Sequence, residues 1–167
     1  MDISNSGFVL LIHIAEQLTA KTYEDLVRTE VFDVANMNSS GVARNNQTEI
    51  FAKGYKDATR KNFTTVDFPF ENVDGAGSVY STTEDLYKLE QALRTGKLLT
   101  EKSKSLMLKQ QIPEKYGYGW FIRERGGSWD VYWHKGDLPG VTTFIGRRAQ
   151  KNQLIENDLA KILKTPE

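Results

Sequence analysis

The sequence of 167 residues has no cysteine, only two histidines and no long apolar run. The missing cysteine excludes disulfide scaffolds, thiolate-bound zinc and cysteine nucleophiles, and two histidines are too few for a histidine-rich metal site. The longest apolar run, Phe8–Ala15 interrupted by His13, is shorter than the ~20 residues that cross a membrane. The sequence therefore predicts no bound metal, no cofactor and no membrane span.

Excess charge of either sign is also missing, because 22 basic residues balance 22 acidic ones. Charged residues at 26% and aromatic residues at 11% are typical of a soluble globular protein. Over residues 101–151, ten Lys and Arg residues stand against five Asp and Glu residues. This local excess would attract a small anion, but it is too small for a nucleic-acid footprint, so we expect no nucleic-acid partner. A solvated face is the simpler interpretation.

Four stretches combine helical spacing of apolar residues with signals for a helix end. Asn5 or Ser6 is positioned to cap the first stretch, and Thr22 the second. The third begins after Ser81, which has the spacing of a capping box with Glu84. The predicted helices are Ser6–Leu18, Tyr23 to about Val31, Thr82–Thr95 and Glu101–Lys109.

After Pro113 the chain becomes rich in aromatic and β-branched residues, in short runs separated by turn-forming residues. Such runs predict an antiparallel meander. Its strands are expected at Tyr116–Arg123, Trp129–His134 and Val141–Arg148, with turns at Gly126-Gly127 and Asp137–Gly140, and Lys151–Ile155 would start a fourth strand. A separate strand is expected before Pro113, at Ile50–Tyr55.

Helices followed by strands and a final helix indicate an α+β fold, in which an antiparallel sheet is flanked by helices. We predict a single domain over residues 1–167, mainly helical over 1–112, with antiparallel strands over 113–155 and a C-terminal helix over 156–167. The aromatic side chains of the sheet could form a core or a stacking platform for sugars or bases. Alternation along the strands favours the core.

A polar segment, His134-Lys135-Gly136 followed by Asp137, stands at the end of the second predicted strand. A cationic or hydrogen-bonding side chain at a strand edge is suited to holding an anionic or carbonyl group. The glycine would let a ligand approach the backbone, and the amide that follows could face a developing oxyanion. A structural histidine followed by an ordinary turn is the alternative that the residues alone leave open.

Four segments of the chain, taken together, carry a family resemblance. In chain order they are Ser4-Asn5-Ser6-Gly7-Phe8, Gly75-Ala76-Gly77-Ser78-Val79-Tyr80-Ser81-Thr82-Thr83-Glu84-Asp85-Leu86, Tyr116-Gly117-Tyr118-Gly119-Trp120, and His134-Lys135-Gly136 with Pro139-Gly140. They resemble the serine β-lactamase and penicillin-binding-protein superfamily, in the class C-like branch that also holds esterases and D-amino-acid peptidases. The resemblance implies a β-lactamase/transpeptidase-like fold that is incomplete, with this chain as its C-terminal portion.

The resemblance also implies an activity and roles for individual residues. The family hydrolyses or transfers acyl groups of β-lactams, D-alanyl peptides or esters through the serine of a Ser-x-x-Lys motif. By this resemblance, Asn5 would contact the substrate amide and His134 would lie near the substrate carboxylate. Gly136 and the backbone amide of Asp137 would form the oxyanion hole, with Lys135 beside them as a substrate-binding residue.

Three departures from the family pattern bear on activity. No serine in the sequence is followed by lysine three residues later, so the nucleophile and its lysine are absent. Ile3 stands where the family has a tyrosine, and the apolar strand breaks off after Ile155. We expect this chain to be inactive alone, as the C-terminal part of a longer enzyme. The alternative is a naturally shortened binding or interaction module of the same fold.

The implied partner is a small-molecule or peptidoglycan-like substrate that carries a carboxylate. An incomplete fold would also leave a sheet edge and apolar helix faces uncovered, so we expect self-association or exchange of elements between copies. Asp2 stands where a signal peptide would be basic, so no signal peptide is expected within this sequence. The family resemblance leaves export to the cell envelope open.

Overall fold

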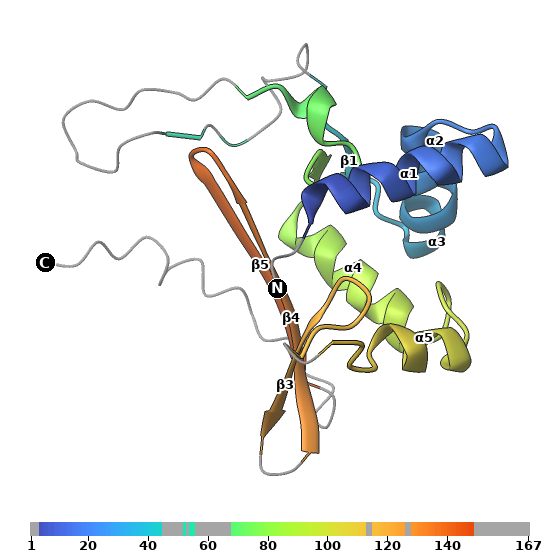
Figure 1. Ribbon diagram of the computed structural model, residues 1–167, viewed down its shortest axis with the longest axis vertical. Helices are drawn as coiled ribbons and strands as arrows, with labels where there is room; N and C mark the ends of the chain where they lie inside the picture. Colours follow the sequence, from blue (N-terminus) through green and yellow to red (C-terminus); the bar gives the residue numbers. More distant parts are fainter. Residues whose placement is uncertain are drawn as a thin grey trace, which may run out of the picture. The chain divides into compact units, whose positions relative to one another are not determined.

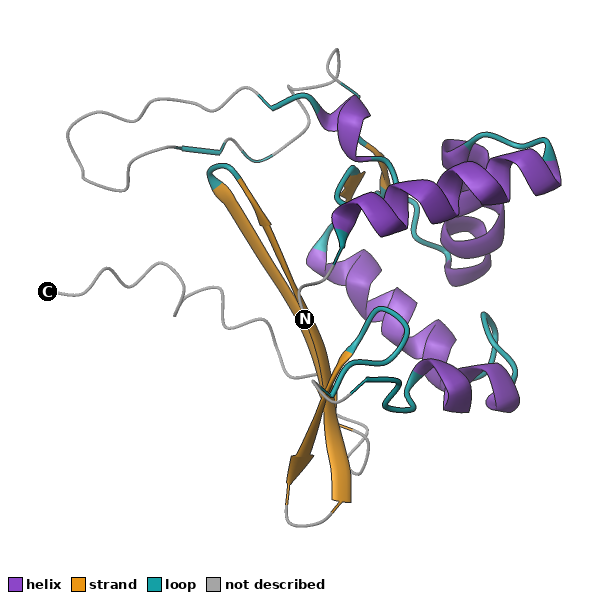
Figure 2. Cartoon of the chain, viewed as in Figure 1, coloured by secondary structure: helices purple, strands orange, loops and turns teal. Residues whose placement is uncertain are grey.

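The computed structural model describes residues 4–44, 52, 54–55, 68–112, 115–125 and 128–148 (Figure 1). Its contacts divide the chain into two compact units. The first comprises Met1–Ala52 with Asp67–Thr100, and the second comprises Lys53–Val66 with Glu101–Glu167. Most helices belong to the first unit, whereas the larger sheet belongs to the second (Figure 2). Helices and antiparallel sheets together confirm the α+β class.

Three of the predicted elements lie wholly or largely on residues that the structure does not describe. The strand predicted at Ile50–Tyr55 lies largely outside the described residues, and the strand from Lys151 to Ile155 and the helix over 156–167 lie entirely outside them. The prediction of one domain over the whole chain stays a prediction.

Helix α1, Asn5–Thr19, opens the first unit and confirms the first predicted helix. Its cap is Ser4, whose hydroxyl accepts a hydrogen bond from the Gly7 N–H at 3.1 Å. The predicted caps, Asn5 or Ser6, are therefore wrong by one or two residues. Ser4 has the extended backbone that a capping residue needs, whereas Asn5 is already helical.

The second predicted helix is longer than expected. It comprises α2 (Tyr23–Val27), a π-helical turn η1 (Arg28–Phe32) and α3 (Asp33–Ala35) in direct succession. The hydroxyl of Thr22 caps it by accepting from the Asp25 N–H, as the sequence predicts.

Helix α4, Thr83–Arg94, confirms the third predicted helix but not its cap. The Thr82 hydroxyl accepts from the Asp85 N–H, so the predicted pair of Ser81 and Glu84 is displaced by one residue. Asp85 thus lies in the first turn of α4, and it is only 1% exposed.

The core of the first unit lies where α4 meets the π-helical turn and α3. Its fully buried members are Phe32, Ala35, Met37 and Ala92, with Val27, Val31, Leu89 and Leu98 packed around them. Two short strands, β1 (Gly41–Val42) and β2 (Val79–Tyr80), pair antiparallel in the same unit, and a 3-10 turn, η3 (Phe70–Val73), precedes β2.

The second unit contains α5 (Glu101–Met107) and a three-stranded antiparallel sheet in the order β3–β4–β5. The strands are β3 (Phe121–Arg125), β4 (Ser128–Leu138) and β5 (Val141–Arg148). This order confirms the predicted meander. The first strand begins later than predicted, because Gly119 has a left-handed φ of +81° and turns the chain before Phe121.

Strand β4 continues past His134, which was predicted to end it. Leu138 lies opposite Val141, so the turn contains only Pro139-Gly140 and the predicted turn over Asp137–Gly140 is too long. The reason is cross-strand pairing, because β5 offers a partner to each residue of the polar segment. Gly140, at a φ of +77°, supplies the left-handed position of the turn.

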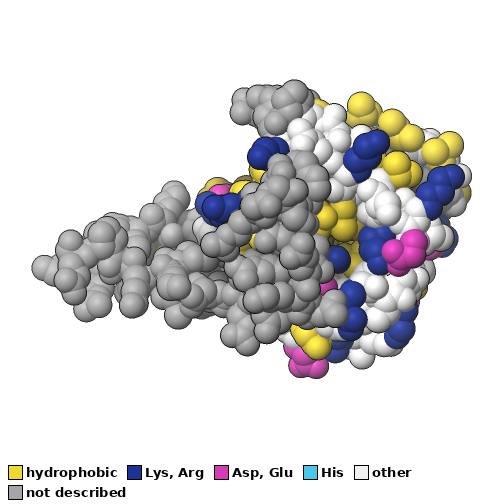
Figure 3. Space-filling model, turned by 90° about the horizontal axis from the view of Figure 1, so that it is seen from below, with side chains coloured by type: hydrophobic (Ala, Val, Ile, Leu, Met, Phe, Trp, Pro, Cys, Tyr) yellow, Lys and Arg dark blue, Asp and Glu magenta, His cyan; other side chains and the backbone are white. Residues whose placement is uncertain are grey.

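Two surface properties complete the description. Among the residues that the structure describes, no helix is long and apolar enough to cross a membrane. On the face shown in Figure 3, Lys and Arg side chains are scattered among uncharged and apolar ones.

Candidate functional site

Asn5 is an exposed residue in the first turn of α1. The preceding Ser4 fixes this turn by capping it, as described above. Ile3, which stands where the family has a tyrosine, lies outside the described residues. Because Asn5 is part of α1, its position in the first unit depends on the contacts that hold this helix.

The loop at Gly75 forms a close seat for α1. Gly75 has a left-handed φ of +79°, and its backbone lies against the second and third turns of the helix. A Cβ atom added there would lie 3.0 Å from the carbonyl oxygen of Phe8 and would overlap the side chain of Ile12. Two of the four resembling segments, the one at Asn5 and the one at Gly75, are thus in contact within the first unit.

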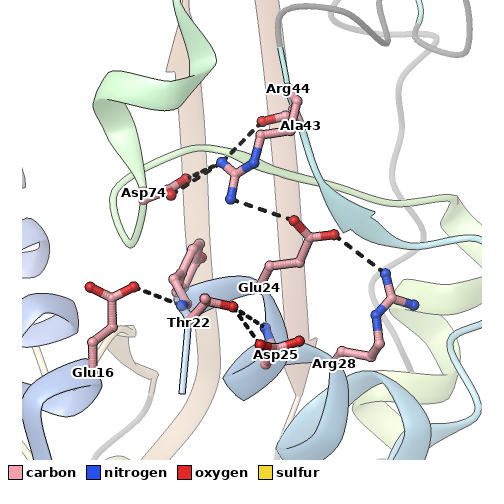
Figure 4. Close-up of polar contacts among 9 residues, drawn as sticks. Glu16, Thr22, Glu24, Asp25, Arg28, Ala43, Arg44 and Asp74 are labelled. Atoms are coloured by element: carbon pink, nitrogen blue, oxygen red, sulfur yellow. Dashed lines mark hydrogen bonds and ion pairs between the residues drawn. The ribbon is translucent and has the colours of Figure 1, made fainter. Parts of the chain in front are cut away.

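An ion-pair network holds this loop to α2 (Figure 4). Arg44 binds both carboxylate oxygens of Asp74 through Nη1, at 2.9 and 3.1 Å, and its Nη2 lies 3.6 Å from Glu24. Glu24 also pairs with Arg28 at 3.6 Å. A hydrogen bond to Asp74, opposed by burial, raises the pKa of Arg44, so the guanidinium stays charged. The network fixes the residue just before Gly75.

Helix α1 is also tied to α2 by a direct hydrogen bond. The Tyr23 N–H donates to Oε1 of Glu16 at 2.8 Å. Tyr23 itself is buried, and burial raises the pKa of its hydroxyl. Helix α1 is therefore held at two places along its length, by the glycine loop near Phe8 and Ile12 and by α2 near Glu16.

In the second unit, His134 and Tyr116 form a hydrogen-bonded pair. Tyr116 Oη lies 3.1 Å from His134 Nε2, and both side chains are half-buried. The ring of Phe121 lies beside them, with its centroid 5.7 Å from the imidazole centroid. Burial lowers the pKa of His134, and a backbone hydrogen bond with Lys135 opposes this shift. The other two resembling segments, at Tyr116 and at His134, thus meet in the second unit.

Among the residues that the structure describes, no strand pairs with the second edge of β4 beyond His134. Hydrogen-bonded pairs recur at every second residue, beginning with the pair that flanks a two-residue turn. Leu138 begins this series, so Gly136 and His134 bond to β5 while the N–H of Asp137 points to the opposite edge. Strand β3 pairs with β4 only as far as Trp133, so it does not cover Asp137. An amide at this edge can donate to an acyl oxygen.

Gly136 faces a crowded neighbour on β5. A Cβ atom added there would lie 2.5 Å from Oγ1 of Thr143, which is directly opposite. Any larger residue at this position would force the Thr143 side chain to shift, so cross-strand packing alone favours glycine here.

Lys135 and Asp137 form an ion pair with each other. Lys135 Nζ lies 2.6 Å from Asp137 Oδ2, and the Thr142 hydroxyl donates to Asp137 Oδ1 at 2.9 Å. Hydrogen bonds from Lys135 and Thr142 lower the pKa of Asp137. The positive charge that the sequence offers to an anionic ligand is thus already countered within the strand. Their spacing of two residues, which places them on one face, could have indicated this pairing.

The aromatic residues of the sheet pack mainly against one another. Trp133 stacks between Phe121 and Phe144, with centroid distances of 4.4 and 5.9 Å. This contact supports the core interpretation for these three. Tyr118, in contrast, is 62% exposed. Within the described part of the chain, no group of three or more Asp, Glu or His side chains could hold a metal ion.

Sequence reasoning placed Asn5 at the N-terminus of a helix and His134 on a strand, as observed, and their roles stay predictions. It missed the Tyr116–His134 contact, because these two residues lie far apart in the sequence. Asn5 belongs to the first unit and His134 to the second. The structure therefore defines two local arrangements, one in each unit.

Comparisons with known proteins agree on one family. The family model described as Beta-lactamase matches residues 4–155. The penicillin-binding protein PbpX of Bacillus subtilis (strain 168) is 30% identical over 140 residues, which cover 83% of this chain and 34% of PbpX. The chain thus spans about a third of this curated relative's length.

Solved structures give the same result. A penicillin-binding protein from Bacillus halodurans has a TM-score of 0.82 and 28% identity, covering 91% of this chain and 48% of that protein. A D-amino acid amidase from Ochrobactrum anthropi SV3, solved with L-phenylalanine amide, has a TM-score of 0.74 and 27% identity, covering 92% and 48%. An octameric penicillin-binding protein homologue from Pyrococcus abyssi has a TM-score of 0.72 and 25% identity, covering 88% and 35%. The chain belongs to the β-lactamase family, within the superfamily of serine β-lactamases and penicillin-binding proteins.

Proposed function

We propose that this chain supplies the substrate-binding half of an acyl-transferring serine hydrolase and does not form an acyl-enzyme by itself. The carrying observation is the edge of β4, where the N–H of Asp137 points away from β5 and Gly136 precedes it. This amide would donate to the acyl oxygen of the substrate as negative charge develops there. Asn5 would contact the substrate amide. His134 and Lys135, on the same strand as Asp137, would contact the substrate beside this amide.

The substrate class that fits best is a D-aminoacyl compound, such as a D-alanyl peptide or a D-amino acid amide, or else a β-lactam. The support comes from two kinds of relative, the penicillin-binding proteins and the D-amino acid amidase. The countered charge of Lys135 argues against a site that depends on a strong cation. A substrate carboxylate would have to displace Asp137 from Lys135.

Magnitudes indicate that the chain alone is inactive. Loss of the nucleophile in a serine hydrolase costs on the order of 10⁶ in kcat, whereas an oxyanion-hole donor contributes about 10²–10³. The sequence contains no Ser-x-x-Lys motif, so binding groups alone remain. They cannot compensate for the missing bond-forming step.

We expect no covalent adduct when the purified chain is incubated with a fluorescent penicillin. Intact-mass spectrometry and in-gel fluorescence measure this directly, with the Bacillus halodurans penicillin-binding protein as the positive control. A stoichiometric adduct would show that another residue acts as nucleophile. Tryptophan fluorescence titrated with N-acetyl-D-alanyl-D-alanine tests the binding part of the proposal, and an unchanged signal with no chemical-shift changes at Asp137 or Gly136 would contradict it.

The exposed face of α1 supports self-association with a second copy. Leu10, Leu11, Ile14 and Leu18 form one stripe and are 45–81% exposed. The stripe contains no charged residue, so two copies can meet across it without like charges facing each other. The octameric relative shows that this family includes oligomers. Helices that are apolar on more than one side are usually buried by a partner.

Replacing Leu11 and Leu18 with lysine is therefore expected to shift the chain toward monomer. Burial of apolar surface drives the association, and two charges in the stripe oppose it. Light scattering over a concentration series measures the change, and Val34→Lys serves as the control because Val34 is an exposed apolar residue of α3, outside the stripe. A wild-type chain that stays monomeric at high concentration would contradict the proposal.

A further inference from the structure

One peptide bond of the chain joins an aspartate to a glycine, at Asp74-Gly75, and the sequence has no other Asp-Gly pair and no Asn-Gly pair. Because glycine has no side chain to shield its backbone nitrogen, this nitrogen can approach and attack the side-chain carbon Cγ of the preceding aspartate. An Asp-Gly bond is therefore where aspartate isomerises most readily in an unfolded chain. In a folded chain, the rate depends on what holds the carboxylate and the glycine in place.

The isomerisation has two steps and needs only water. In the first step, a bond forms between the Gly75 nitrogen and Asp74 Cγ, and a Cγ–O bond breaks. The oxygen leaves as water with the amide proton and a proton from solvent, and a cyclic succinimide remains. In the second step, water opens the ring. Cleavage of the new N–Cγ bond restores aspartate, whereas cleavage of the original peptide bond leaves isoaspartate, in which the main chain passes through the side chain.

An ion pair opposes the first step in the folded chain. Arg44 Nη1 donates to both carboxylate oxygens of Asp74, at 2.9 and 3.1 Å, so Cγ cannot turn toward the next nitrogen without breaking these bonds (Figure 4). Glu24 holds Arg44 in turn, because its carboxylate lies 3.6 Å from Nη2. The side chains of Arg44 and Asp74 are only 26% and 29% exposed, so water screens this pair less than a fully exposed one.

Packing around Gly75 is a second restraint. Its backbone lies so close to α1 that an added Cβ would be 3.0 Å from the carbonyl oxygen of Phe8 and would overlap Ile12. A planar succinimide changes the direction of the main chain at this position. A loop packed this closely cannot adopt that direction without shifting against the helix, so the ring forms only when the loop opens.

We propose that Asp74-Gly75 is a covalent modification site at which isoaspartate forms when the loop opens, and that the ion pair with Arg44 keeps the loop closed. Isoaspartate at residue 74 lengthens the main chain directly before Gly75. The close seat of α1 on Gly75 would then be lost, and Asn5 would move with the helix. The modification would thus change the structure of the first unit without changing the mass of the chain.

Ageing of the purified chain at neutral pH tests the proposal. Peptide mapping, combined with labelling by an isoaspartyl methyltransferase, measures isoaspartate at residue 74 over time. We expect Arg44→Gln to accumulate it about fivefold faster than the wild type, because loss of the ion pair makes the loop open more often. Arg28→Gln is the matched control, because Arg28 joins the same network through Glu24, 3.6 Å away. Its rate should differ from the wild-type rate by less than about twofold.

The wild-type chain unfolded in guanidinium chloride is the reference for an unprotected bond. It should form isoaspartate more than about tenfold faster than the native chain. Equal rates in the native and the unfolded wild type would overturn the proposal, even if Arg44→Gln failed to fold. So would an unchanged rate in an Arg44→Gln chain that circular dichroism shows to be folded. Neither result bears on the proposed function, because no ligand is present.

Discussion

Replacement of Asp85 by asparagine is expected to lower the free energy of unfolding by about 3 kcal/mol. Asp85 Oδ2 accepts from the Ser39 N–H at 2.7 Å and from the Ser40 hydroxyl at 2.8 Å. Its Oδ1 accepts from Lys88 Nζ at 2.8 Å. An asparagine could keep the first two bonds, but its NH₂ group would then face the Lys88 ammonium. The buried charged acceptor would be lost, and the asparagine NH₂ group and the Lys88 ammonium would face each other as two donors.

The matched control is Glu84→Gln, on the same helix and with the same partner. Glu84 lies 3.4 Å from Lys88, but its side chain is 79% exposed, so its loss should cost less than about 0.5 kcal/mol. Urea denaturation measures both variants, and hydrogen exchange at Ser39 locates the change. Equal effects of the two substitutions would show that the buried contacts of Asp85 add nothing beyond a surface ion pair.

The contribution of Asp85 also has a defined dependence on pH. Burial alone would raise its pKa, but hydrogen bonds from Lys88, Ser40 and Ser39 outweigh burial and lower the pKa. A carboxylate with a depressed pKa stabilises the folded state above its unfolded-state pKa, and this stabilisation is lost as pH falls through the folded-state pKa. The difference between wild type and Asp85→Asn should therefore be largest near neutral pH and shrink in acid. A constant difference would contradict this.

The second large effect is expected for Gly75→Ala, which should lower the free energy of unfolding by about 3 kcal/mol. Part of the cost arises from the left-handed φ of +79°, which an L-residue adopts with strain. The rest arises from the overlap with Ile12 and the approach to the Phe8 carbonyl. Helix α1 must move to relieve the overlap, so hydrogen-exchange protection along α1 should fall.

Gly119→Ala separates the two causes. Gly119 has nearly the same φ, +81°, but an added Cβ would meet no atom within 4 Å, so we expect a loss of only about 1 kcal/mol. Combining Gly75→Ala with Ile12→Ala removes the overlapping side chain. The double variant should therefore lose less unfolding free energy than the sum of the losses of the two single variants. Additive costs would show that Ile12 does not carry the effect.

Local signals were sufficient for much of the fold. Apolar spacing placed α1 and α4 to within a residue or two, and the aromatic and β-branched runs predicted the three-strand meander in its observed order. Capping residues were harder, because several neighbouring Ser, Thr and Asn residues can each accept an amide hydrogen bond. The observed caps, Ser4 and Thr82, are the ones whose backbone is extended, which the residue type alone does not reveal.

Long-range contacts account for what local signals missed. Strand β4 runs on through His134 because β5 pairs with it as far as Leu138. Asp85 turns inward because its partners, Ser39 and Ser40, come from a loop more than 40 residues earlier. Tyr116 reaches His134 across 18 residues. No periodicity within one element encodes such pairs.

By itself, the sequence determined the composition limits, the order of helices and strands, the family resemblance and the absence of a Ser-x-x-Lys nucleophile. Each of these depends on residue types and short spacings, which folding does not change. Only the tertiary structure decided which polar groups are satisfied by one another, as in the Lys135–Asp137 and Tyr116–His134 pairs. The physical reason is that charge and proton position depend on neighbours that the fold brings together. In a chain without cysteine, those neighbours decide what its hydroxyl and carboxylate groups can do.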